Sequence, residues 1–202
     1  MPATECQLIP LDEMAPGSVG AIRNSVIDSV VKLASSELKM TPEQLIVRDV
    51  NPVRDLIMYS TGTTTATTED WVYTMAATAG YISVTGTQNM ADNRYVALYG
   101  LRNLRAGQGT HATSTVAFAP VVIAPSISLV RITVGGADKV IWSLDSTIPY
   151  RMHEVGFSPT AVIIPQNASF NIAFYHKVAQ AQIMQIQLVG IVVEPRGKVI
   201  SP

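Results

Sequence analysis

The sequence has few charged residues and a single cysteine. Of its 202 residues, 14% are charged, against about 25% in an average soluble domain, and the formal net charge is −1. A near-neutral chain offers no basic face for phosphate groups, so we expect no nucleic acid as a partner. Because Cys6 stands alone, it has no partner for a disulfide within the chain, which fits synthesis in a reducing cytoplasm.

Long apolar runs are also missing. The longest, residues 116–125 and 188–193, fall well short of the ~20 residues of a membrane-spanning helix. Residues 1–18 have neither the basic head nor the apolar segment of a signal peptide. We therefore expect no membrane partner. The chain is nevertheless 48% hydrophobic, which predicts that part of its surface is covered by other copies or by a partner.

Motifs for catalysis and metal binding are absent from the sequence. It contains no nucleophile elbow, no zinc-protease motif and no phosphate-binding loop. His111, His153 and His176 are not spaced as metal ligands, and none is next to Cys6. The sequence therefore predicts no catalytic, cofactor-binding or metal-binding residues, and we expect that the protein is not an enzyme.

Residues 1–17 are predicted to form an extended N-terminal arm. Prolines at positions 2, 10 and 16 interrupt any regular element there, while Leu8, Ile9 and Leu11 could anchor the segment on an apolar surface. A disordered tail and an arm that packs on a neighbouring molecule are the two interpretations. In the second interpretation these three residues are candidate interface residues.

A helical segment is predicted over residues 18–44. Ser18 is the expected N-cap, and the main helix is expected to end near Leu38. Thr41 and Gln44 have the spacing of a capping box for a second, short helix. Apolar residues recur along the main helix at steps of three and four, which indicates one buried face: Val19, Ile22, Val26, Val30 and Leu33.

Residues 45–202 read as a β-domain. Strands are predicted at 45–50, 54–59, 71–75, 80–85, 94–101, 113–119, 126–134, 138–144, 161–165, 169–176 and 181–194. A glycine-rich turn at 135–138 joins two of them as a hairpin. This many short strands with long connections predict a mainly β fold, a jelly-roll-like β-sandwich with an N-terminal extended arm and one α-helix.

The last predicted strand is apolar on both faces over its second half. Leu188 and Val192 should face the sandwich core, and Val189, Ile191 and Val193 should then face outward. Outward aliphatic residues need a cover. Either another chain provides it, which would make these three residues interface candidates, or the helix at 18–38 does.

An apolar β-sandwich with a proline-broken arm, low charge and no catalytic constellation resembles viral structural proteins. Residues 126–193, which end in "MQIQLVGIVV", resemble the paired strands of the capsid cement (decoration) proteins of tailed bacteriophages. That resemblance implies a protein of the virion, made in the host cytoplasm, which binds the major capsid protein. It also implies a homo-oligomer, and a trimer is the expectation.

Two alternatives remain open. The first is a receptor- or carbohydrate-binding module of a virion fibre, for which aromatic residues would form a sugar platform: Trp71, Tyr73, Tyr81, Tyr95 and Tyr99. The second is the jelly-roll shell protein itself. An exposed aromatic cluster with measurable glycan binding would favour the first alternative.

Overall fold

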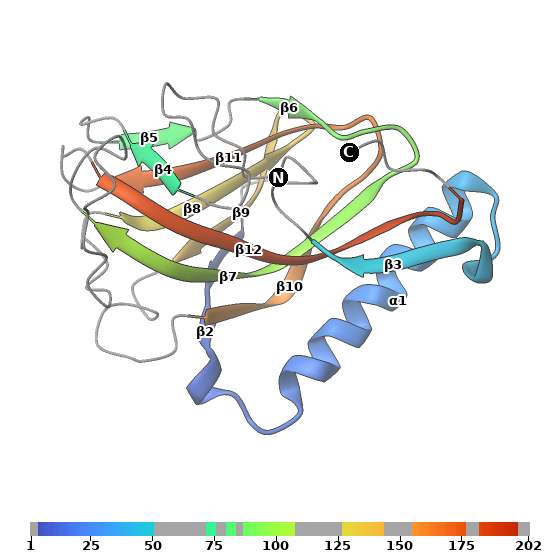
Figure 1. The fold of residues 1–202 in the computed structure, drawn as a ribbon, viewed down its shortest axis with the longest axis horizontal. Coiled ribbons are helices and arrows are strands. Elements are labelled where there is room, and N and C mark those ends of the chain that lie inside the picture. The colour runs from blue at the N-terminus through green and yellow to red at the C-terminus, as the bar shows by residue number, and fades with distance from the viewer. Residues whose placement is uncertain are drawn as a thin grey trace.

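The chain folds as two packed β-sheets with one long helix on the outside of the second sheet (Figure 1). This computed structural model describes residues 4–50, 72–75, 80–83, 87–107, 127–143, 155–176 and 182–197. The mainly β sandwich predicted from the sequence is confirmed. Two of the expected strands, at 54–59 and 113–119, lie outside the described residues.

In the described part of the chain, each sheet has six strands. Sheet A has the order β1 (Thr4–Gln7), β9 (Ala137–Ser143), β8 (Ile127–Val134), β11 (Ser169–His176) and β5 (Gly80–Ser83), and β6 (Gln88–Asn89) also pairs with β11. Sheet B has the order β2 (Ile9–Pro10), β10 (Val155–Ile164), β7 (Tyr95–Gly107), β12 (Gln182–Pro195) and β3 (Leu45–Asp49), and β4 (Val72–Met75) also pairs with β12. Among the described strands, all pairs are antiparallel except β1 with β9.

Four of the antiparallel pairs are nested along the chain. The outermost pair is β3 with β12, followed by β5 with β11 and β7 with β10, and the innermost pair is the β8–β9 hairpin. The chain therefore folds as one long hairpin of paired segments that is rolled into two sheets. The innermost hairpin turns at Gly135 and Gly136, whose φ angles of 61° and 74° glycine adopts without steric cost. The predicted hairpin is confirmed.

Alternation of side chains builds the main core between the sheets. Val130 and Ile132 on β8 point inward with Leu98 on β7 and Val192 on β12, and Trp142 on β9 is fully buried among them. The predicted inward orientation of Leu188 and Val192 is confirmed. β10 begins at Val155, six residues before the predicted strand.

The long helix, α1 (Ser18–Leu38), ends where the sequence predicted. Its N-cap is Gly17 in a left-handed conformation, with φ of 85°, rather than the expected Ser18. Two short 3-10 helices flank it, η1 (Leu11–Glu13) and η2 (Pro42–Gln44). At the start of η2 the Gln44 Oε1 accepts the Thr41 N–H at 2.8 Å, as the predicted capping box requires.

Candidate interaction surfaces

A second apolar core lies between α1 and the outer face of sheet B. Val26, Val30 and Ala34 of the helix are buried there. Strand residues complete this core: Leu45, Tyr95, Ala97, Tyr99, Phe157, Ile191 and Val193. The helix crosses below β12, β7 and β10 in Figure 1. The apolar stripe predicted for residues 18–38 therefore packs on the chain's own sheet.

The residues of this second core show what covers the outer face of β12. Ile191 and Val193 have 0% exposure, and Val189 is partly buried against the same cluster. The helix covers these residues, which was one of the two covers expected from the sequence. The interface role suggested for Ile191 and Val193 is thus wrong, because neither has surface for another chain to contact.

The N-terminal segment belongs to the sandwich instead of extending away from it. β1 pairs with β9 of sheet A, and β2 pairs with β10 of sheet B, so residues 4–10 cross from one sheet to the other (Figure 1). Leu8 lies at the crossing, where it is 0% exposed in the main core and its N–H donates to the Ser143 carbonyl at 3.4 Å. The expected interface role of Leu8 is wrong, because its side chain belongs to the chain's own core.

Exposed aliphatic residues mark the two edges of sheet B. Ile9 and Leu11 are 37% and 38% exposed, and Ile46 and Val47 are 41% and 37% exposed. The first two lie on β2 and in η1, and the other two lie on β3, which is the opposite edge strand. Within the described parts of the chain these four are the large hydrophobic side chains that remain exposed. Ile9 and Leu11 were predicted candidates, but Ile46 and Val47 were not.

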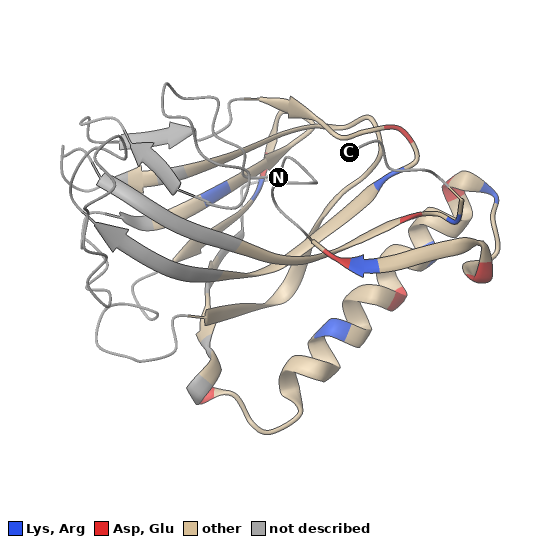
Figure 2. Cartoon of the chain, viewed as in Figure 1, with Lys and Arg blue, Asp and Glu red and all other residues tan. Residues whose placement is uncertain are grey.

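An ion triad closes the main core beside β3. Glu194 is 2% exposed; its carboxylate accepts from Arg48 Nε at 3.0 Å and from Arg94 Nε at 3.3 Å. The three side chains come from β12, from β3 and from the residue before β7. Burial of a carboxylate is costly unless it is paired and hydrogen-bonded. Because the Glu194 carboxylate must therefore stay beside both guanidinium groups, the triad holds β3 in place against β12 and β7. Charges are sparse on most of the described strands and more frequent on α1, on β3 and in the nearby turns (Figure 2).

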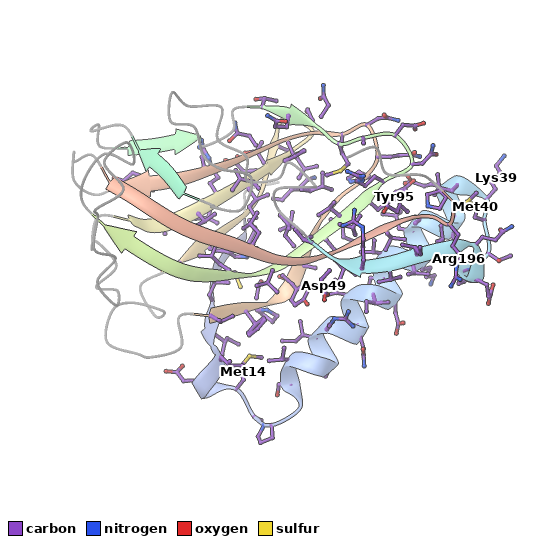
Figure 3. The ribbon with its side chains drawn as sticks, viewed as in Figure 1. Met14, Lys39, Met40, Asp49, Tyr95 and Arg196 are labelled. Carbon is purple, nitrogen blue, oxygen red and sulfur yellow. The ribbon has the colours of Figure 1, made fainter. Side chains whose placement is uncertain are left out.

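Polar contacts also join the helix to sheet B. The Tyr95 hydroxyl donates to Glu37 Oε2 at 2.7 Å. Burial is the larger cause of the raised pKa of Tyr95, and this hydrogen bond is the second cause. Arg23 pairs with Asp49 at 3.1 Å on the surface. Burial raises the pKa of Tyr99 as well. The ring of Tyr99 stacks on the ring of Phe157, with 6.2 Å between the ring centroids. Figure 3 labels Tyr95 near the C-terminal part of α1 and Asp49 near the end of β3.

These contacts bear on the proposed sugar platform. Tyr95 is 0% exposed and Tyr99 is 3% exposed, so neither ring can contact a ligand from solvent. The Trp71 position lies outside the described residues, and the side chains of Tyr73 and Tyr81 do as well. The described rings therefore do not form the exposed platform that the carbohydrate-binding alternative requires.

A shallow groove of about 430 Å³ lies between α1 and β10. Ile22 and Val26 of the helix line one wall, and Pro159, Ala161 and Ile163 line the other. The lining carries hydroxyl groups but no charged side chain. Beside it, the Ser158 hydroxyl donates to the Thr160 carbonyl at 2.7 Å, so the bulged part of β10 satisfies some of its own backbone groups.

The chain matches no protein-family model and no curated protein.

In the described part of the chain, no three histidine, cysteine or acidic residues gather in a group that could hold a metal ion. Cys6 Sγ lies 3.7 Å from Ser158 Oγ. Among the described helices, none has the length and apolar character to cross a membrane.

Proposed function

We propose that the protein is a structural component of a virus particle, a capsid cement protein that binds the assembled shell and stabilises it. The observation that supports this most is the nested strand order of the two sheets. We infer a jelly roll from eight strands paired in this way, and jelly rolls occur in viral capsid domains as well as in lectins and cupins.

Fold alone does not specify function, so the surface must also fit the role. A cement protein works by adhesion, and adhesion needs apolar contact and few charges that would have to be desolvated. The chain has 14% charged residues, and its exposed aliphatic residues gather at the two edges of sheet B. The proposed partners are the major capsid protein and other copies of this chain, with three-fold symmetry on the assembled shell as the expectation, and the proposed location is the virion.

The jelly-roll shell protein is the second candidate, and the same strand order favours it. A shell protein differs from a cement protein in one measurable property: it forms closed shells without another capsid protein. The fibre module with a carbohydrate site has less support, because Tyr95 and Tyr99 are buried.

Immunogold labelling tests the proposal. Antibodies against the purified protein should label the outside of intact virus heads in lysates of the organism that carries the gene. Electron microscopy of the purified protein alone is the matched control, and it should show small particles without closed shells. Closed shells would identify the shell protein instead, and absence of label from virus particles would refute both candidates.

A further inference from the structure

β3 is an edge strand whose outer side carries open hydrogen-bonding groups. It pairs only with β12 in the described chain, and Figure 1 shows it as the outermost strand of sheet B, with α1 below. An edge strand offers its unpaired N–H and C=O groups to another extended chain unless the protein protects them.

Two hydrogen bonds at the ends of β3 show which of its residues face β12. The Val50 N–H donates to the Gly190 carbonyl at 3.0 Å, and the Arg196 N–H donates to the Gln44 carbonyl at 2.8 Å. In an antiparallel ladder, hydrogen-bonded pairs recur at every second residue. The even-numbered residues of β3 therefore direct their N–H and C=O groups toward β12, and the odd-numbered residues direct theirs outward.

Both ends of this outer side are protected. At one end the Leu45 N–H donates to the Pro42 carbonyl, and the Leu45 carbonyl accepts from Arg196 Nε at 3.2 Å. At the other end the Asp49 carbonyl accepts from Arg48 Nη1 at 3.5 Å. Figure 3 labels Asp49 and Arg196 near opposite ends of the strand.

The middle of the strand is open. Among the described residues, the outward N–H and C=O of Val47 have no partner, and neither has the N–H of Asp49. The side chains of Ile46 and Val47 are exposed at the same place. A short extended backbone that carries apolar side chains is therefore the chemistry that fits this edge.

We propose that the occupant is β3 of a second copy, paired antiparallel about a two-fold axis at Val47. The two open groups of Val47 lie on the axis of this register, which places the open Asp49 N–H opposite Leu45. Val47 would exchange two hydrogen bonds with its counterpart, and each Asp49 N–H would donate to the free lone pair of the opposite Leu45 carbonyl. The two Val47 side chains would then meet on one face, and on the other face Ile46 would lie against the stem of the opposite Arg48. No two like charges stand directly opposite in this register.

The size of the contact predicts its strength. A pair of five-residue strands buries less than the ~1,200–2,000 Å² of a stable protein–protein interface. The dimer should therefore be weak in solution and should form at high protein concentration. This inference goes beyond the proposed function, because a contact between β3 strands does not depend on which particle the protein joins.

Sedimentation velocity over a range of protein concentrations tests the contact. The unmodified chain should show a reversible monomer–dimer equilibrium, and Val47→Lys should raise its dissociation constant at least about tenfold. Ile9→Lys is the matched control, because Ile9 is equally exposed at 37% but lies on the opposite edge of the sheet. A chain that stays monomeric at the highest concentration would overturn the inference, as would association that Val47→Lys leaves unchanged.

Cross-linking tests the symmetry. In a chain with Cys6→Ser, a Val47→Cys substitution places two thiols across the axis at a Cα separation of about 5.5 Å, within the range of a disulfide. Oxidation should give a covalent dimer, whereas Ile9→Cys in the same background should not. Equal cross-linking of both variants, or none at Val47→Cys, would rule out this register. A confirmed dimer without label on virus particles would leave the contact standing and remove the proposed function.

Discussion

Replacement of Ile191 tests the second core most directly. Its side chain is 0% exposed beneath α1, so Ile191→Ala removes buried methyl and methylene groups and leaves a cavity. Such substitutions cost about 2–5 kcal/mol. With about 2–4 °C of Tm per kcal/mol for a chain of this size, a loss of about 3 kcal/mol lowers Tm by about 6–12 °C. Ile191→Lys should be more damaging, because it places an unpaired charge in an apolar core.

The matched control is Ile46→Lys, at a position that is 41% exposed. It should change stability by no more than about 0.5 kcal/mol at a protein concentration that keeps the chain monomeric. Thermal unfolding followed by circular dichroism measures all three variants. If Ile191→Lys unfolded at the temperature of the unmodified chain with its helix content intact, α1 would not cover the strand, and the reasoning would fail.

Three further predictions follow from other contacts. Leu8→Ala should cost about 2–5 kcal/mol in urea unfolding, and an unchanged midpoint would place residues 4–10 outside the core. Glu194→Gln should cost about 3 kcal/mol because it removes the negative charge that compensates two partly buried guanidinium groups, whereas Arg23→Ala at the exposed pair should cost less than about 1 kcal/mol; equal losses would contradict this. The pKa of Tyr95 is raised on folding, so its stabilising effect is complete below about pH 10 and is lost as pH rises toward the folded pKa. Tyr95→Phe should therefore flatten the fall of Tm above pH 10, and parallel pH profiles would refute the assignment.

Local features of the fold could be predicted from the sequence. The helix and its end at Leu38 could be predicted because its apolar residues recur with a clear helical period. The hairpin at Gly135 and Gly136 could be predicted because a glycine-rich tight turn depends on few neighbouring residues. The helical cover of Ile191 was one of two expected covers, because sequence periodicity shows that a face needs a cover but not which element provides it. That choice depends on packing between distant segments.

Features that depend on pairing between distant strands could not be predicted. Tyr99 is an extra residue in β7 without an opposite partner on β10 or β12. Its neighbours show why: a Cβ at Gly190 would overlap the Ala97 carbonyl oxygen, and one at Gly100 would lie 2.8 Å from the Gly156 carbonyl oxygen. These glycines let three strands approach closely where the register shifts. Nothing local in the sequence distinguishes them from glycines in turns.

The open edge of β3 was missed for a related reason. Ile46 and Val47 read as ordinary strand residues, and their exposure depends on which strands flank β3 in the sheet. Their neighbour Arg48 gave no signal either, because its partner Glu194 lies 146 residues away. Edge position is a property of topology, so an interface at an edge cannot be inferred before the strand order is known.

The two cores change the argument for self-association. From composition alone, a chain that is 48% hydrophobic seemed to need other copies to cover its surface. The structure instead buries apolar residues in one core between the sheets and in another beneath α1, so composition no longer requires a partner. The case for a second copy now depends on a short stretch of β3 with open backbone groups beside Ile46 and Val47. Substitutions at Ile191 and Val47 therefore test different statements: the first should change folding without a specific effect on association, and the second should change association without an effect on folding.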